Sequence, residues 1–253
     1  MARVRTSSIA ARLRASGLAH ATPAEWGEVL TSPVLADWET FAASWDRLDR
    51  DDWMADGGSY RCRRFAAFAL DDGIVVRKPH QPHFQSRLHN RLNGGVDRWF
   101  SPVEPMIGNH PVTHALLTAG YVLASSLTGG KCIEWHAEMH QFRIEARPGE
   151  KALPTPEGLH RDGVTAVLMM LVGRDNASGG VSEIRDTRGE LVARIELATP
   201  LEAIVLDDRR LHHEVSAIGP AAPDRPAVRD ALVLTFREGS GQPSPQARTV
   251  AGN

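Results

Sequence analysis

The N-terminal part of the chain carries apolar residues at the three- and four-residue steps of amphipathic helices. Thr22-Pro23-Ala24-Glu25 supplies a cap, a proline at the first helical position and a glutamate at the third, which is a capping-box pattern. Ser32-Pro33 repeats the cap-then-proline signal, and a shorter basic helix is indicated around Ile9 and Leu13. We therefore predict that residues 1–58 are mainly helical. The clearest apolar series is Leu35, Trp38, Phe41, Ala42, Trp45 and Leu48.

From residue 60 onward the pattern changes to short runs that alternate or are continuously apolar, as in β-strands. Asp71-Asp72-Gly73 and Asp186-Thr187-Arg188-Gly189 each separate two such runs and predict hairpins. Pro111–Leu127 interrupts the series as a helix that ends at Thr128-Gly129-Gly130. Many short strands with regular turn signals favour a sandwich or a barrel. The predicted strands are 60–70, 74–77, 133–146, 164–172, 181–185, 191–195, 203–206, 213–218 and 231–236.

The predicted strand 133–146 has two chemically different faces, because successive strand residues point to opposite sides. One face carries His136, Glu138, His140, Phe142 and Ile144. The other face carries Trp135, Ala137, Met139, Gln141 and Arg143.

Two further segments show no sustained period. Residues 78–109 are rich in Pro, His, Asn and Gly, and a long irregular segment inside a compact domain is usually functional or mobile. Residues 238–253 are rich in Gly, Ser, Pro and Gln, and we expect them to form a disordered tail.

Composition narrows the class of partner. The 253 residues are 42% hydrophobic and 24% charged, with a formal net charge of -2, so they suit one globular domain. No long basic run is present, which argues against a nucleic-acid partner. No apolar stretch approaches the ~20 residues that span a bilayer.

Cys62 and Cys132 lack metal or redox spacing, so we expect reduced thiols in a cytoplasmic protein. Residues 1–24 contain Arg3, Arg5, Arg12 and Arg14 and no acid. An organellar transit peptide would show a similar bias, but the short basic helix explains it without one, and we prefer the helix.

One set of residues combines metal-binding chemistry with a suitable scaffold. His160-Arg161-Asp162 places an imidazole and a carboxylate on the same face of an extended segment, and His213 begins a predicted strand further along. Two histidines and one carboxylate on one face of iron(II) leave the opposite positions open for a co-substrate and dioxygen. The spacing alone is a weak signal, because His136-x-Glu138 and His212-x-Glu214 also occur.

His136 and His140 are four residues apart, which is the spacing of a helical zinc pair. However, no glutamate follows the first histidine, and the flanking alternation indicates a strand. Zinc-protease chemistry is therefore not favoured.

Several stretches around the candidate ligands resemble those of bacterial 2-oxoglutarate/iron dioxygenases that hydroxylate free L-amino acids (the L-isoleucine 4-hydroxylase-like family). The resemblance covers roughly residues 60–237 and is dense after residue 140. It implies a double-stranded β-helix (jelly roll, cupin-like) core, in agreement with the predicted strands. The similar stretches are Pro154-Thr155-Pro156-Glu157-Gly158-Leu159-His160-Arg161-Asp162-Gly163, Leu171-Val172-Gly173-Arg174-Asp175-Asn176, Gly179-Gly180-Val181-Ser182, Leu206-Asp207-Asp208-Arg209-Arg210-Leu211-His212-His213 and Arg229-Asp230-Ala231-Leu232-Val233-Leu234-Thr235-Phe236.

The resemblance implies that His160, Asp162 and His213 hold Fe(II). In the family pattern the last ligand precedes a small residue and then Val, so His213 matches better than His212. Glu214 stands in place of the small residue and is a departure from that pattern. Adjacent strand residues face opposite ways, so only one histidine of the doublet can reach the metal.

The resemblance also implies that Arg229 binds the far carboxylate of 2-oxoglutarate, since a guanidinium grips a carboxylate with two parallel hydrogen bonds. Arg225 is the nearest alternative, and Ala231 stands where related enzymes often have a small hydroxyl residue. Asp207 and Asp208 are candidates for orienting His213, and for at least one of them we prefer a solvated turn. The residues implied for substrate binding are Gln85, Asn90, Arg98, His140, Arg143 and Ser182.

We therefore expect a mainly β fold with N-terminal helices, in one catalytic domain of residues 1–237. Its parts would be a helical region, 1–58, and a jelly-roll core, 60–237, with a helical insertion at 110–127. The implied activity is hydroxylation of an unactivated C–H bond in a free L-amino acid or a similar small metabolite. It would use Fe(II), 2-oxoglutarate and O2 and release succinate and CO2.

Two alternatives remain open at this point. A non-oxidative cupin-like metalloenzyme would share the jelly roll but would normally show a His-x-His pair, which the sequence lacks. A non-catalytic jelly-roll binding protein would need neither the three ligands nor Arg229. No nucleic-acid or membrane partner is expected in any of these cases.

Overall fold

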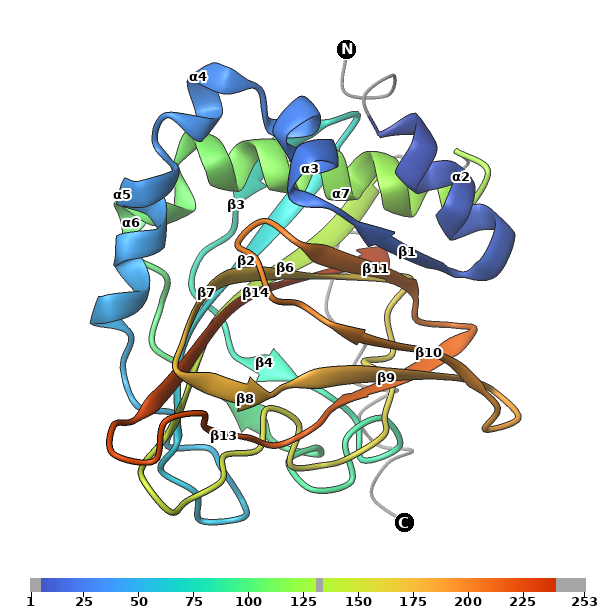
Figure 1. Cartoon of the computed structure of the whole chain (residues 1–253). Coiled ribbons are helices and arrows are strands. Elements are labelled where there is room, and N and C mark those ends of the chain that lie inside the picture. The colour runs from blue at the N-terminus through green and yellow to red at the C-terminus, as the bar shows by residue number, and fades with distance from the viewer. Residues whose placement is uncertain (1–5, 131–133, 240–253) are drawn as a thin grey trace.

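A computed structural model describes residues 6–130 and 134–239 of the chain. Two layers of antiparallel β-sheet face each other, and helices cover the outer face of the larger sheet (Figure 1). This arrangement is a jelly roll with helices packed against it. It confirms the mainly β fold with N-terminal helices that the sequence predicts.

The larger sheet has seven strands in the order β1-β11-β7-β14-β6-β2-β3, and all neighbouring strands run antiparallel. The smaller sheet has the order β10-β9-β12, and β13-β8 and β4-β5 form two short ribbons. The strands are β1 Leu18–Ala21, β2 Arg61–Asp71, β3 Ile74–Arg77, β4 His83–Phe84, β5 Asp97–Arg98, β6 Glu134–Ala146, β7 Ala166–Asp175, β8 Ala177–Gly179, β9 Val181–Asp186, β10 Leu191–Glu196, β11 Ala203–Asp207, β12 Leu211–Val215, β13 Ile218–Pro220 and β14 Ala227–Glu238.

The predicted capping box is present. Thr22 accepts a hydrogen bond from the backbone N–H of Glu25, and the Glu25 carboxylate accepts one from the backbone N–H of Thr22. The apolar series from Leu35 to Leu48 is divided among three short helices rather than lying on one. The helices are α2 Ser7–Ser16, α3 Pro23–Leu30, α4 Ser32–Leu35, α5 Trp38–Ala42, the 3-10 helix η1 Ala43–Arg47, α6 Pro105–Gly108 and α7 Pro111–Leu127.

One strand of the N-terminal region was not predicted. β1 pairs with β11, with His20 opposite Ile204, and forms one edge of the larger sheet. Four residues are too few to reveal a strand period, and the partner strand lies near the other end of the chain. The prediction of a helical region is therefore wrong for Leu18–Ala21.

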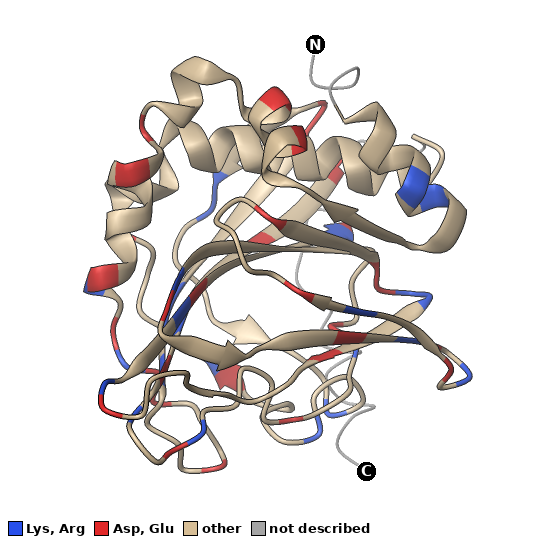
Figure 2. Cartoon of the chain, viewed as in Figure 1, with Lys and Arg blue, Asp and Glu red and all other residues tan. Residues whose placement is uncertain are grey.

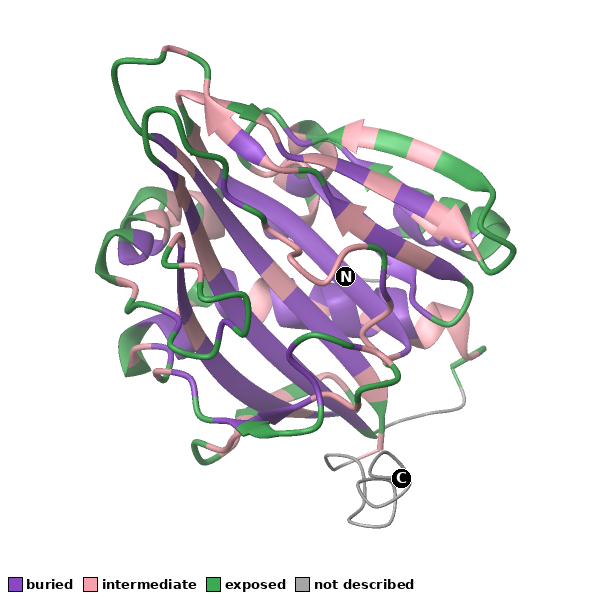
Figure 3. Ribbon diagram, turned by 90° about the horizontal axis from the view of Figure 1, so that it is seen from below, coloured by how far each residue is buried: buried purple, intermediate pink, exposed green. Residues whose placement is uncertain are grey.

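The two faces of the larger sheet differ because residues alternate along each strand. On β6, Trp135 and Met139 belong to the hydrophobic core that includes the helices, whereas Glu138 and His140 line a cavity between the sheets. This alternation is the one that the sequence predicts. Charged positions of both signs lie in strands of both sheets as well as in loops (Figure 2). Most of the larger sheet is buried, and the exposed residues lie chiefly in connecting loops (Figure 3).

Some sequence predictions concern residues that lie partly or wholly outside 6–130 and 134–239. β14 continues to Glu238, and residues 240–253 of the predicted tail lie outside the described residues. Cys132 also lies outside them, whereas Cys62 is buried and free. Within the described ranges, no helix is long and apolar enough to cross a membrane.

Helix α7 packs against β14 at Gly120, where an added methyl group would overlap the ring of Phe236. Phe236 is 1% exposed, so the ring has no free space into which it could move. We expect Gly120→Ala to lower the free energy of unfolding by about 1–3 kcal/mol, which corresponds to a loss of roughly 3–10 °C in thermal midpoint. Thermal unfolding followed by circular dichroism measures this change.

Gly27→Ala is the matched control. Gly27 also lies in a helix, α3, but a methyl group there would only touch Leu35 at 3.9 Å. Alanine has the better helix propensity by about 1 kcal/mol, so this variant should keep or raise the midpoint. Equal midpoints for the two variants would contradict the close packing of α7 on β14.

Candidate metal centre and substrate cavity

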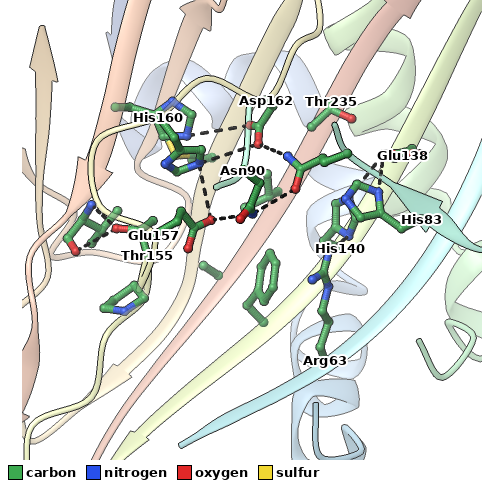
Figure 4. A pocket seen from close by; sticks show the side chains of 18 of the residues that line it. Arg63, His83, Asn90, Glu138, His140, Thr155, Glu157, His160, Asp162 and Thr235 are labelled. Carbon is green, nitrogen blue, oxygen red and sulfur yellow. Dashed lines mark hydrogen bonds and ion pairs between the residues drawn. The ribbon is translucent and has the colours of Figure 1, made fainter. Parts of the chain in front are cut away.

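A cavity lies between the two sheets of the jelly roll. Inward-facing residues of β2, β6, β7 and β14 form one side of its wall, and His213 and Val215 of β12 contribute from the smaller sheet. Residues of the irregular segment, among them Gln85, Asn90 and Arg98, complete the wall together with residues of 154–164. Figure 4 shows two polar groups in this cavity, one at His160 and Asp162 and the other around Glu138, with Asn90 between them.

The first group contains His160, Asp162 and His213, whose candidate ligand atoms all lie within 4.8 Å of one another. His160 Nε2 lies 3.7 Å from Asp162 Oδ1, and His213 Nε2 lies 3.8 Å from Asp162 Oδ2. The backbones of His160 and His213 exchange two hydrogen bonds, of 3.0 and 2.9 Å, which fix the two imidazoles side by side. The structure thus brings the three predicted ligands together, and a donor set of this type suits iron(II).

Both histidines of this group direct Nε2 toward Asp162. His160 Nδ1 donates to the carbonyl of Gly158 at 2.8 Å, which leaves Nε2 as the nitrogen available to a metal. Burial, together with the neighbouring His160, lowers the pKa of His213 to about 3, which keeps that ring neutral. Burial acts against the imidazolium of His160 as well, but Asp162 and Glu157 outweigh it and raise the pKa of His160.

The alternative ligand His212 lies on the other side of β12. His213 is 4% exposed and lines the cavity, whereas His212 is only partly buried and lies outside the wall. This follows from strand alternation, since adjacent side chains point in opposite directions.

Asp208 fixes the backbone that carries Asp162. Its carboxylate accepts hydrogen bonds from the backbone N–H groups of Asp162, Gly163 and Val164, at 2.9, 2.8 and 3.0 Å. Burial and the neighbouring Asp162 raise the pKa of Asp208. The sequence suggested that Asp207 and Asp208 orient His213. Instead, Asp208 positions the segment of Asp162, and Asp207 pairs with Arg209 at 3.0 Å.

The second group surrounds the buried carboxylate of Glu138. His83 Nδ1 lies 2.9 Å from Glu138 Oε2, and His136 Nε2 lies 3.2 Å from Oε1. His140 Nε2 lies 3.7 Å from Oε2. Burial alone would raise the pKa of Glu138, but the three histidines hold it well below its usual range. The ligand atoms of His83, Glu138 and His140 are as close together as those of the first group, so geometry alone permits a metal here too.

The hydrogen bonds behind the histidines distinguish the two groups. An Arg63 guanidinium nitrogen lies 2.7 Å from His140 Nδ1 and can only donate, so the proton of the neutral His140 ring is on Nε2, toward Glu138. Lys78 Nζ likewise lies 2.8 Å from His136 Nδ1. These rings turn N–H groups to the centre, whereas metal-binding histidines turn lone pairs to it. The second group therefore has the properties of a hydrogen-bond network.

Arg229 enters the cavity from β14 and is 4% exposed. Its Nε is buried and has no hydrogen-bond partner within the described part of the chain. Burial lowers the pKa of Arg229 to about 10, so the side chain remains cationic at neutral pH. Gly180 packs against its stem, and a methyl group at Gly180 would lie only 3.2 Å from Arg229 Cδ. The alternative, Arg225, lies outside the cavity wall and pairs with Asp175 at 3.0 Å.

Four of the six residues predicted to contact substrate line the cavity, namely Gln85, Asn90, Arg98 and His140. Arg143 does not, because it lies on the opposite face of β6, where it pairs with Asp230 at 2.7 Å and Asp46 at 2.8 Å. Ser182 does not either, because it is enclosed in β9 between β10 and β12. These two placements correct the sequence prediction.

The charged residues of the wall that were not predicted as site residues are Arg61, Arg63, Glu138, Glu157 and Arg237. Arg61 and Arg63 alternate along β2 and face inward with Phe65, so strand alternation could have identified them. Glu157 lies three residues before His160, and no sequence period marks it as part of the wall.

Comparison with known proteins agrees with this geometry. A model of the family described as 2OG-Fe dioxygenase matches residues 42–235. The chain is 23% identical over 170 residues to 3(1)-hydroxy-L-isoleucine 4-dioxygenase of Pantoea ananatis (strain AJ13355). The aligned region covers 66% of this chain and 68% of that protein.

Two crystal structures are similar over nearly the whole chain. One is a bsmA homologue from Methylobium petroleophilum PM1, with 35% identity, coverage of 93% of this chain and 94% of that one, and a TM-score of 0.85. The other is IDO from Bacillus thuringiensis, with 19% identity, coverage of 92% and 99% and a TM-score of 0.75, which supports the fold alone. The family match spans most of the chain. The chain therefore belongs to the 2OG-Fe dioxygenase family, whose chemistry requires Fe(II), 2-oxoglutarate and O2.

Proposed function

We propose that this dioxygenase hydroxylates an unactivated C–H bond of a free L-amino acid or a similar small amino-acid-derived metabolite. The observation that carries the proposal is the direct contact between the polar cavity wall and the candidate metal centre. Gln85 Nε2 donates to Asp162 Oδ1 at 2.9 Å, and Arg98 and Asn90 both donate to Gln85 Oε1. A small polar molecule on this wall would lie beside the reacting centre. The similarity to the Pantoea relative, which is named as a hydroxy-L-isoleucine dioxygenase, supports the same substrate class.

His160, Asp162 and His213 would hold Fe(II) in this proposal. Bound Fe(II) with 2-oxoglutarate and O2 supplies an oxidation in which one oxygen atom enters the substrate C–H bond and the other enters succinate, with loss of CO2. The chain's own residues prepare the site: Gly158 orients the ring of His160, Asp208 fixes the backbone of Asp162, and Gln85 holds Asp162 Oδ1. Their role is to fix the ligands before the metal binds.

The substrate class can be tested by a screen of free amino acids for stimulation of succinate formation by the iron-loaded enzyme. We expect at least one free amino acid to stimulate succinate formation, and its N-acetyl and ester derivatives to fail. Omission of O2 should stop the reaction, which separates this activity from that of a non-oxidative cupin-like enzyme. A preference for a peptide or a carrier-bound residue would overturn the substrate class and leave the family chemistry standing.

We propose that Arg229 binds the distal carboxylate of 2-oxoglutarate. Among the residues that the structure describes, no acid forms a hydrogen bond with its buried guanidinium, and a charge-assisted hydrogen bond is worth about 1.5–3 kcal/mol. Arg229→Ala should therefore raise the Michaelis constant for 2-oxoglutarate at least tenfold. Arg225→Ala is the matched control, since Arg225 is exposed and should leave that constant within about twofold. The reverse pattern would transfer the role to Arg225.

We also propose one catalytic domain of residues 1–237 and a cytoplasmic location. The free, buried thiol of Cys62 supports the second point, because disulfides are rare in that compartment.

A further inference from the structure

We propose that the cavity binds both charged poles of a free α-amino acid, with Arg98 pairing with the carboxylate and Glu157 with the ammonium group. The inference rests on the proposed function and assigns its substrate subsites. Both side chains line the cavity, and both contact the glutamine–asparagine pair that leads to Asp162.

Arg98 is assigned to the substrate carboxylate because the wall carries more buried guanidinium groups than the neighbouring Asp51 can pair with. Arg61, Arg63 and Arg98 are all at most 5% exposed. Asp51 pairs with Arg61 at 2.7 Å and with Arg63 at 3.9 Å. Arg98 has no carboxylate within 4.0 Å in the described parts of the chain. Its hydrogen-bonded partner is the neutral amide of Gln85, and its Nε has none. A buried cation without an anion is costly, and a substrate carboxylate would compensate it.

Arg98 is better placed for this role than Arg63. Arg63 donates to His140 and stacks over the Phe100 ring at 3.6 Å and the Phe142 ring at 4.6 Å. These contacts commit its guanidinium to the network around Glu138. Arg98 lies farther from Phe100, at 5.4 Å, and keeps free donor capacity.

The negative pole is Glu157, whose side chain is 11% exposed. One carboxylate oxygen accepts from Asn90 at 3.2 Å, and the other is buried and has no hydrogen-bond partner in residues 6–130 and 134–239. Within the described residues no lysine or arginine pairs with Glu157; its nearest titratable partner is His160, at 3.8 Å. An ammonium group would supply both the missing charge and the missing donors.

The two poles lie close enough for one small molecule. Three hydrogen bonds, of 2.8, 3.2 and 3.2 Å, connect Arg98 to Gln85, Gln85 to Asn90 and Asn90 to Glu157. Gln85 also contacts Asp162, so an α-carbon held between the poles would lie near the candidate metal ligands. The wall further includes Phe84, Phe142, Met169 and Val233, which suit a hydrocarbon side chain. The expected substrate class is a free α-amino acid with an aliphatic side chain.

Single-pole analogues test this assignment. The ligands are the best amino acid of the free-amino-acid panel and two analogues of it, one without the amino group and one without the carboxylate. For L-isoleucine, these are 3-methylpentanoic acid and 2-methylbutylamine. Binding is measured by calorimetry without O2, on enzyme loaded with Fe(II) and 2-oxoglutarate, for the wild type, Glu157→Gln, Arg98→Gln and Arg98→Lys.

Glu157→Gln should weaken binding of the amino acid at least tenfold and leave binding of the deaminated acid unchanged. Arg98→Gln should weaken binding of the amino acid at least tenfold and leave binding of the amine unchanged. Arg98→Lys should weaken binding of the amino acid less than Arg98→Gln does, because it keeps the charge. Arg237→Gln is the matched control, since Arg237 also lines the cavity with an unpartnered Nε. This control variant should weaken binding of the amino acid by no more than it weakens binding of the single-pole analogues.

The outcomes separate this inference from the proposed function. If no free amino acid binds the wild type, the subsite assignment is overturned, and so is a free amino acid as the substrate in the proposed function. If an amino acid binds and the two variants affect all three ligands alike, the subsite assignment is overturned and the proposed function stands. If Glu157→Gln instead lowers the affinity for Fe(II) without this selectivity, Glu157 belongs to the metal centre and the assignment is also overturned.

Discussion

Alanine at position 160, 162 or 213 is expected to abolish iron binding and iron-dependent turnover, whereas His212→Ala should retain both. Each of the three changes removes one donor of a set whose atoms lie within 4.8 Å of one another. Loss of a group that merely orients a ligand typically costs 10–100-fold in metal affinity, so loss of a ligand should cost more than about 100-fold. Iron content after anaerobic reconstitution and succinate formation measure the two effects.

His212→Ala is a close control, because the same residue type is removed from the same strand at the adjacent position. His212 is partly exposed and lies outside the cavity wall. An inactive His212→Ala together with an active His213→Ala would show that the ligand assignment is wrong.

Glu138→Ala is expected to cause the largest loss of stability. The carboxylate is buried among His83, His136 and His140, and its removal takes away the acceptor that their ring nitrogens face. Breaking a buried charged network of this kind costs about 3–5 kcal/mol, or roughly 10 °C in thermal midpoint for a chain of this size. Glu145→Ala, on the same strand but only half-buried, should change stability by no more than about 0.5 kcal/mol.

The effect of Glu138→Ala should depend on pH. Because the histidines hold the pKa of Glu138 below its ordinary 4.5, the carboxylate stabilises the fold above that value, and its contribution is lost as the pH falls further. The difference in midpoint between wild type and variant should therefore be full near pH 7 and shrink in strong acid. The folded variant should also retain its iron, since this group is a hydrogen-bond network. Loss of iron with an intact fold would indicate a metal at Glu138.

Strand alternation was the most informative feature of the sequence. It separated the two faces of β6 correctly, and it placed Arg143 on the face opposite His140. The family resemblance nevertheless suggested both as substrate contacts, and only His140 lies in the cavity wall. A local geometric rule was more reliable here than similarity carried over residue by residue.

The remaining features depend on contacts between distant segments. Glu157 lies beside Asn90 in the cavity wall, and Arg61 is buried beside Asp51. No local pattern shows that these charged residues leave the surface. Asp208 could be recognised as a supporting residue, but its partners, the backbone N–H groups after Arg161, follow from the meeting of two loops. The sequence therefore predicted the architecture and the ligand cluster well, and the substrate wall only in part.

The pairing of β1 with β11 affects how the protein is made. Residues of β1 leave the ribosome before those of β11, and most of the other strands of the larger sheet are synthesised between them. β11 is an open edge until β1 docks. A shortened protein starting after Ala21 would keep that edge permanently exposed, with backbone groups available to strands of other molecules. Expression of such a truncation carries a risk of aggregation even though it removes none of the cavity-lining residues.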